Sequence, residues 1–324
     1  MKPLVPVDIK PSNPVEVPRD RIREKLWELL GLENDRPAVD FTIGRETITE
    51  ENLRMFPVSY ENSLGDTVSG IVLASKGKTA GSRPGIVCMP GTSGSAERVT
   101  DLRFFREKPD QGPLIGWGRE LARRGFAVIA ITLAGCTVRR ESESEWDAQE
   151  KLLAPFGRSQ MGVHVDEALR AARVLIDMKI ADADRIGMTG MSLGGNAAWY
   201  SIACADWIKA SVPVCGGVGS LPRVVHEGDN MRHSHYYYVP HMLRYFDHPE
   251  VVSACIAPRP FMVIGPTGDE DMPKSGVDRL VDKVSPVYSA LGQPEFFKVY
   301  QPDSRHVFKF EYFEWMADWF EKHL

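Results

Sequence analysis

The order of apolar and polar positions divides most of the chain into short apolar runs and amphipathic stretches. From residue 83 onward the two kinds alternate. Buried apolar strands separated by helices are typical of a parallel sheet with crossover helices. The pattern therefore predicts an α/β fold with a mostly parallel central sheet flanked by helices. The predicted strands are RPGIVCMPG (83–91), FAVIAITLAG (126–135), DRIGMTG (184–190), KASVPVCGG (209–217), RPFMVIGP (259–266) and PEFFKVYQP (294–302).

Apolar residues at helical spacing mark the intervening helices. We predict helices over 117–125, 196–207 and 310–324, the last at the end of the chain. A further helix over 163–178 has one continuous apolar face. That face carries Val165, Ala168, Leu169, Ala172, Leu175 and Ile176.

The first fifty residues differ from this rhythm. Residues 1–20 are rich in proline and are predicted to form an extended arm, followed by a helix over 19–32 with Ile22, Leu26, Leu29 and Leu30 at helical spacing. Two strand patterns come next, 53–60 and 67–75, joined by ENSLGD, and they predict an antiparallel hairpin. We therefore divide the chain into an N-terminal arm and helix (1–50) and one main domain (51–324).

Two later segments interrupt the alternation. Residues 136–160 contain a charge cluster, which predicts a solvated loop. Residues 217–250 are irregular and rich in histidine and tyrosine. Insertions over the carboxyl edge of a sheet commonly shape a substrate site, so 217–250 is the candidate for a small lid.

Charge and cysteine content narrow the function classes. The net charge of -5 offers no basic field for nucleic acid or an anionic membrane, which favours a small-molecule substrate. The five cysteines form no CxxC pair and are predicted to be buried free thiols. With no apolar leader at the start and no N-x-S/T sequon, these features favour a cytoplasmic setting. The sequence leaves homo-oligomer formation open.

GMSLGG (190–195) is the strongest chemical motif. It follows the predicted strand 184–190 and precedes the predicted helix 196–207, which is the strand–turn–helix context of a G-x-S-x-G nucleophile elbow. Gly190 and Gly194 allow the sharp turn, and Ser192 projects its hydroxyl from it. Ser192 is therefore the candidate nucleophile.

A serine nucleophile needs a histidine base, and a carboxylate to orient that base. His306 lies in a polar loop between the last strand and the last helix and is the candidate base. Asp269, Glu270 and Asp271 follow the strand 259–266, at an edge where functional groups gather. On spacing alone each of these three carboxylates remains a candidate for the acid.

The developing oxyanion needs amide donors. The Leu193 amide follows the nucleophile, and the loop MPGTSGS (89–95) offers a second donor, with Gly91, Gly94 and the Thr92 amide available. His233, His235 and His241 could suggest a metal, but they lack an HExxH pattern and nearby cysteine or paired acidic ligands. We interpret Tyr236, Tyr237 and Tyr238 as residues that pack in a cap, and the sequence leaves substrate contact by them open. We expect no metal and no cofactor.

The ordered motifs GIVCMPGTSGS, DRIGMTGMSLGGNAAW, ACIAPRPFMVIGPTGDEDMP and RHVF resemble the dienelactone hydrolase-like and acetyl-xylan-esterase-like branch of the α/β-hydrolase superfamily. The resemblance covers residues 54–324. It implies an α/β-hydrolase fold and a triad of Ser192, Asp269 and His306. The resemblance selects Asp269 among the three carboxylates because in such proteins a proline stands four residues after the acid, as Pro273 does here. The Thr92 and Leu193 amides would then form the oxyanion hole. Pro90-Gly91 departs from the His-Gly that family members often carry there.

These features predict a cytoplasmic serine esterase that cleaves short-acyl, for example acetyl, esters through an acyl-enzyme. Amide or peptide hydrolysis by the same triad is the first alternative, and a non-catalytic ligand-binding module on the same fold is the second. Because side chains diverge from a turn, Asp271 is expected to face solvent or to cap the segment 274–284.

Overall fold

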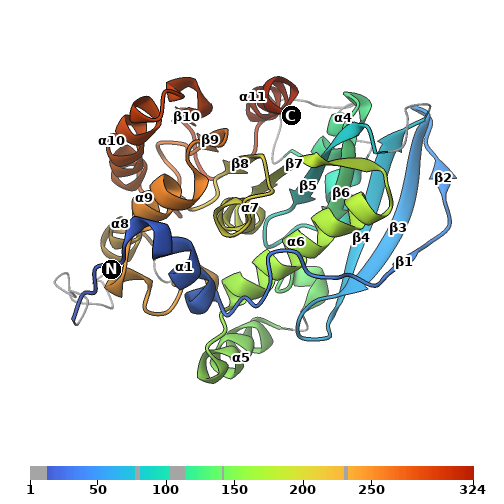
Figure 1. Ribbon diagram of the computed structural model, residues 1–324. Coiled ribbons are helices and arrows are strands. Elements are labelled where there is room, and N and C mark those ends of the chain that lie inside the picture. The colour runs from blue at the N-terminus through green and yellow to red at the C-terminus, as the bar shows by residue number, and fades with distance from the viewer. Residues whose placement is uncertain (1–12, 77–80, 102–113, 141, 230–232) are drawn as a thin grey trace.

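The computed structural model describes residues 13–76, 81–101, 114–140, 142–229 and 233–324. Three predicted regions, the arm, the charge cluster and the lid, therefore fall partly outside the described residues, at 1–12, 141 and 230–232 respectively. The described residues form a ten-stranded sheet with helices on both faces (Figure 1). The strands are β1 (Phe41–Ile43), β2 (Thr47–Ile48), β3 (Leu53–Glu61), β4 (Thr67–Ser75), β5 (Arg83–Met89), β6 (Ala127–Ile131), β7 (Ala181–Met191), β8 (Ala210–Val214), β9 (Phe261–Ile264) and β10 (Phe297–Tyr300).

The strands run in the order β1-β3-β4-β6-β5-β7-β8-β9-β10, and β2 also pairs with β3. β3 and β4 form the predicted antiparallel hairpin, with Leu53 opposite Ser75. From β6 to β10 all neighbouring strands are parallel. Their carboxyl ends therefore meet at one edge of the sheet, where active sites of open α/β folds form. This is the α/β fold that the apolar pattern predicts.

Successive side chains of the central strands point alternately into two separate hydrophobic cores, one on each face of the sheet. On β5, Val87 and Met89 enter one core, whereas Ile86 and Cys88 enter the other. All four are completely or almost completely buried. Both faces of a parallel strand must be covered, and this explains why such strands appear in the sequence as continuous apolar runs.

The two cores are covered by different helices. One face carries α1, α6, α7 and α10, and the other carries α2, α4 and α11. Helices α1, α4, α6, α7 and α11 match predicted amphipathic stretches, whereas the sequence pattern predicts no helix over α5 or α10. The helices are α1 (Ile22–Leu30), α2 (Ala96–Thr100), α4 (Trp117–Arg123), α5 (Glu143–Leu153), α6 (Gln160–Asp177), α7 (Leu193–Cys204), α8 (Leu221–Glu227), α9 (His248–Val251), α10 (Lys274–Ala290) and α11 (Phe310–His323), with short turns η1 (Arg19–Arg21), η2 (Thr137–Arg139), η3 (Ala154–Phe156), η4 (His235–Tyr237), η5 (Met242–Arg244), η6 (Val252–Ile256) and η7 (Pro294–Phe296).

Helix α1 is docked on the domain and does not stand apart from it. Its residues Ile22, Leu26 and Leu30 are buried, as their spacing predicts. A Cβ on Gly162 of α6 would lie 1.9 Å from the Leu30 carbonyl oxygen, so only glycine permits this approach. The indole of Trp27 donates a hydrogen bond to the Cys204 carbonyl at the end of α7.

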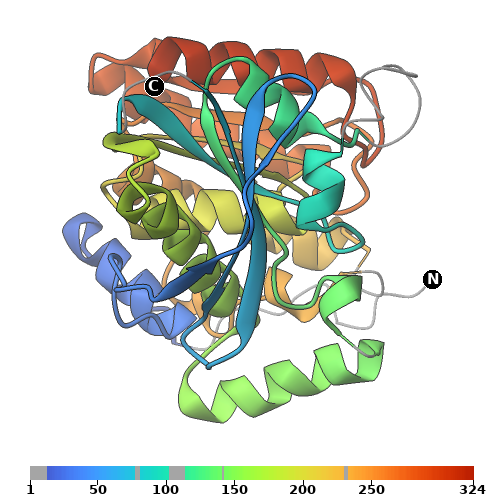
Figure 2. The ribbon, with the colours of Figure 1, turned by 90° about the vertical axis from the view of Figure 1, so that its right-hand side faces the viewer.

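The prediction of a solvated loop over 136–160 is wrong, because this segment contains helix α5 (Figure 2). The Ser142 hydroxyl caps the helix by accepting a hydrogen bond from the Glu145 amide at 3.1 Å. Trp146 anchors it, being buried and stacked on His164 of α6 with ring centroids 5.6 Å apart. A buried indole among charged neighbours leaves little apolar periodicity, and the sequence pattern therefore did not indicate the helix.

All five cysteines are buried and free, as predicted. Among the described residues, no helix combines the length and apolarity that a membrane crossing requires.

Candidate active site

Ser192 lies at a sharp turn between β7 and α7, as the motif predicts. Its backbone has φ 54° and ψ −115°, a conformation that residues with a side chain rarely adopt. A Cβ on Gly194 would lie 2.1 Å from the Met89 carbonyl oxygen, and one on Gly190 would lie 2.4 Å from the Gly194 carbonyl carbon. The two glycines therefore allow β5, β7 and α7 to meet closely enough to hold the serine in this strained turn.

The structure brings His306 and Asp269 together. Nδ1 of His306 lies 2.8 Å from Oδ1 of Asp269, and the Asp269 side chain is almost completely buried. Asp269 follows β9 and His306 follows β10, two parallel neighbours, and a bridge between Gly268 and Arg305 ties their loops. A carboxylate at Nδ1 fixes the tautomer in which Nε2 carries the lone pair that accepts a proton.

Glu270 has a different place from Asp269. Its carboxylate accepts a hydrogen bond from the His306 amide at 3.2 Å and pairs with Arg305. Glu270 thus holds the backbone of the histidine loop rather than the imidazole. Asp269 and Glu270, two of the three candidates for the acid, therefore contact different groups of His306.

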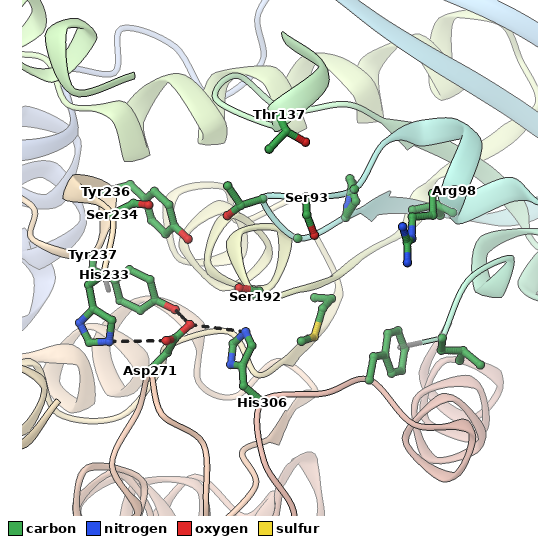
Figure 3. Close-up of a pocket in the computed structure, with 18 of the residues that line it drawn as sticks. Ser93, Arg98, Thr137, Ser192, His233, Ser234, Tyr236, Tyr237, Asp271 and His306 are labelled. Atoms are coloured by element: carbon green, nitrogen blue, oxygen red, sulfur yellow. Dashed lines mark hydrogen bonds and ion pairs between the residues drawn. The ribbon is translucent and has the colours of Figure 1, made fainter. Parts of the chain in front are cut away.

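The expectation that Asp271 faces solvent or caps 274–284 is wrong. Asp271 is 7% exposed and lies in the wall of the cavity that contains Ser192 and His306 (Figure 3). Its Oδ2 lies 3.4 Å from Nε2 of His306 and accepts a hydrogen bond from the Tyr237 hydroxyl at 3.2 Å. Its own amide donates to Oδ1 of Asp269 at 2.9 Å, and this short turn directs both carboxylates to the same imidazole.

The loop after β5 passes beside the nucleophile. Gly91 and Thr92 line the cavity with Ser192, and two backbone hydrogen bonds fix the loop, Gly94 amide to Gly91 carbonyl and Thr137 amide to Thr92 carbonyl. In the part of the chain that the structure describes, the Thr92 and Leu193 amides donate to no backbone group, which leaves them available to an incoming oxygen. The Thr92 and Leu193 amides stay the predicted donors for a developing oxyanion.

A cavity of about 470 Å³ connects these residues. The predicted lid contributes one wall, through His233, Ser234, Tyr236 and Tyr237. The opposite wall was not predicted, because it joins side chains from segments far apart in the sequence. Those residues are Arg98, Val99, Leu114, Trp117, Thr137, Arg140 and Phe308.

The three histidines considered for a metal do not converge. His233 lies 2.7 Å from the Tyr238 hydroxyl, whereas His235 pairs with Asp147 on α5. Among the described residues, one trio of possible ligand atoms lies close together, those of Cys215, Asp269 and His306. Burial raises the pKa of the Cys215 thiol well above its usual range, which disfavours the thiolate that metals bind. The trio therefore fits the Asp–His pair of a hydrolase better than a metal centre.

The chain is similar to known proteins in sequence and in structure, although no family model matches it. YtaP of Bacillus subtilis strain 168, provisionally named as a hydrolase, is 29% identical over 285 residues, which cover 88% of this chain and 92% of YtaP. An acetyl xylan esterase from Paenibacillus sp. R4 superposes with a TM-score of 0.69 at 19% identity, covering 98% of both chains. A glucuronoyl esterase from Solibacter usitatus gives 0.68 at 14% identity, covering 92% of this chain and 91% of that one. The fold is thus the α/β-hydrolase fold.

Proposed function

We propose that this protein is a serine hydrolase that cleaves carboxylic esters with short acyl groups, such as acetyl. The observation that carries the proposal is the placement of Ser192, at a strained strand–helix turn, in one cavity with His306, whose Nδ1 is paired with Asp269. That combination supplies a nucleophile, a base and the group that orients the base.

The proposed reaction begins when the Ser192 oxygen attacks the ester carbonyl carbon and its proton passes to Nε2 of His306. The carbonyl π electrons move to oxygen, and the Thr92 and Leu193 amides stabilise that negative charge. The tetrahedral intermediate then collapses, the bond to the alcohol oxygen breaks, and His306 returns the proton to the alcohol. Water repeats the sequence on the acyl-enzyme and releases the acid. Asp269 stabilises the imidazolium in both halves.

Ester hydrolysis is favoured over amide hydrolysis because the superposed enzymes are named acetyl xylan and glucuronoyl esterases. The substrates in these names are those of the superposed enzymes, and a shared fold does not assign them to this chain. Short acyl groups are favoured because the lid residues Tyr236 and Tyr237 close the cavity on one side of Ser192. The five buried reduced thiols support a cytoplasmic site of action.

The test combines a covalent probe with a substrate series. A fluorophosphonate should label Ser192, and p-nitrophenyl acetate should be hydrolysed faster than both p-nitrophenyl decanoate and the matching anilide. Ser192→Ala should remove labelling and lower kcat by on the order of 10⁴ to 10⁶. Ser201→Ala is the control, because Ser201 is a buried serine of the following helix α7 that lies outside the cavity lining.

Each contrary outcome identifies a different error. Ester turnover by folded Ser192→Ala at the wild-type rate would refute the nucleophile assignment. Faster cleavage of the anilide would move the protein to the amidases, and faster cleavage of decanoate would refute the short-acyl preference. Tight binding of an ester analogue without labelling would favour the ligand-binding module.

A further inference from the structure

Tyr236 lies in the lid turn η4 and is held rigidly. Its side chain is 4% exposed. The ring stacks on Tyr237 with centroids 4.9 Å apart and meets His164 edge-on at 5.5 Å, while Trp146 of α5 closes a third side at 6.3 Å. Three aromatic rings, one each from the lid, α5 and α6, thus fix the direction in which the Tyr236 hydroxyl points.

That hydroxyl points at the nucleophile (Figure 3). It lines the same cavity as Ser192 and Thr92, and it interacts with the side-chain hydroxyls of both residues. Burial raises the pKa of Tyr236 above its usual range, although the hydroxyls of Thr92 and Ser192 act in the opposite direction. At ordinary pH the group is therefore a neutral phenol with a proton to donate.

The neighbouring tyrosines have other partners. The Tyr237 hydroxyl donates to Asp271, and the Tyr238 hydroxyl lies 2.7 Å from Nδ1 of His233. The three consecutive tyrosines thus direct their hydroxyls to three different groups. Tyr236 is the one whose hydroxyl interacts with both Ser192 and Thr92 in the cavity. The Thr92 amide is one of the two proposed oxyanion donors.

We propose that Tyr236 is a catalytic residue whose phenol donates a third hydrogen bond to the oxyanion formed when Ser192 attacks the ester. The proposal rests on the ester hydrolase function proposed above. It adds a side-chain donor from the lid to the two backbone donors, Thr92 and Leu193. The loop after β5 and the lid then form the oxyanion site together.

The step needs no proton transfer from tyrosine. Before attack, the phenol faces the hydroxyls of Thr92 and Ser192 in the cavity. As the new Ser192–carbon bond forms, the serine proton moves to His306 and the carbonyl electron pair moves to oxygen. The ring stays in place, and the phenolic O–H rotates about its C–O bond to donate to that oxygen while keeping its proton. When the alcohol leaves and the carbonyl re-forms, the phenol returns to its former partners.

The decisive variant is Tyr236→Phe, which keeps the ring stack and removes only the donor. We expect kcat for p-nitrophenyl acetate to fall by about 10²- to 10³-fold, the usual cost of one oxyanion donor, with KM changed less than about threefold. Affinity for a trifluoromethyl ketone that forms a tetrahedral adduct with Ser192 should weaken by a similar factor. The control is Tyr288→Phe, which removes an equally buried hydroxyl, bonded to the Arg259 carbonyl, outside the cavity lining.

If the phenylalanine variant fails to fold, a fluorinated tyrosine at position 236 preserves the packing. Fluorination makes the phenol more acidic, so the donor should be lost, and kcat should decline, at lower pH than in the wild type. A folded Tyr236→Phe enzyme with unchanged kcat, one with only a raised KM, or a fluorinated enzyme with the wild-type pH profile would overturn the proposal. Absence of any ester turnover and of probe labelling in the wild type would instead refute the hydrolase function.

Discussion

Asp271 places a carboxylate oxygen 3.4 Å from Nε2 of His306, on the side of the imidazole opposite the one held by Asp269 at 2.8 Å. The histidine thus lies between two buried carboxylates that belong to one short turn. Only the oxygen at Nδ1 occupies the place of the orienting acid in a Ser–His–Asp triad. Asp271 instead faces Nε2, the nitrogen that exchanges a proton with Ser192 in the proposed reaction.

This difference predicts unequal effects of two matched substitutions. Asp269→Asn should lower kcat by at least about 10²-fold, because an amide at Nδ1 favours the wrong tautomer. Asp271→Asn should cost less than about tenfold, since it leaves that bond intact. Steady-state kinetics on p-nitrophenyl acetate, with circular dichroism to verify folding, measures both. A reversed order would assign the role of the acid to Asp271.

The close packing behind Ser192 predicts that Gly194 does not tolerate a side chain. In Gly194→Ala the new Cβ would meet the Met89 carbonyl oxygen at 2.1 Å, and backbone of β5 would have to move. We expect a loss of about 1–3 kcal/mol in the free energy of unfolding, together with reduced probe labelling of Ser192. In the control, Gly265→Ala, the nearest atom is a Val277 side-chain methyl at 3.2 Å. Equal urea midpoints for the Gly194 variant and the wild type would contradict the described turn.

Two buried histidines predict how stability depends on pH. Burial lowers the pKa of His164 to about 3 and that of His248 to about 4, so both are neutral in the folded protein. In the unfolded chain they titrate near 6.5, and below that pH the unfolded state binds protons that the folded state does not. Stability is therefore full above about pH 6.5 and falls as the pH decreases toward the folded-state pKa values. Between pH 7.5 and 5.5 each histidine should contribute a loss of about 1.4 kcal/mol.

Urea unfolding at the two pH values measures this loss. His248→Gln should reduce the pH-dependent difference by about 1.4 kcal/mol, whatever its effect at pH 7.5, because one titrating group is removed. Comparing differences within each protein cancels the change in packing against Trp199, whose ring lies 4.8 Å from that of His248. An unchanged difference in the variant would show that His248 does not stay neutral in the folded state.

The sequence by itself determined the features that depend on neighbouring residues. The alternation of apolar runs and helices predicted the α/β class, and the glycines around Ser192 predicted the turn, because both are local backbone requirements. The order of Ser192, the acidic cluster and His306 placed the functional groups at strand ends. Only the tertiary structure decided which carboxylate meets which nitrogen of His306, since Asp269, Glu270 and Asp271 share one turn and differ only in direction.

Tertiary packing likewise decided where Tyr236 points. Its direction depends on Trp146 and His164, which lie 90 and 72 residues earlier, and α5, the helix that carries Trp146, was itself missed. The lid was recognised from its irregular composition, but composition contains no information on which of three consecutive tyrosines reaches Ser192. A hydroxyl's partner is set by distances between segments far apart in the chain, and those distances exist only after the cores on both faces of the sheet have packed.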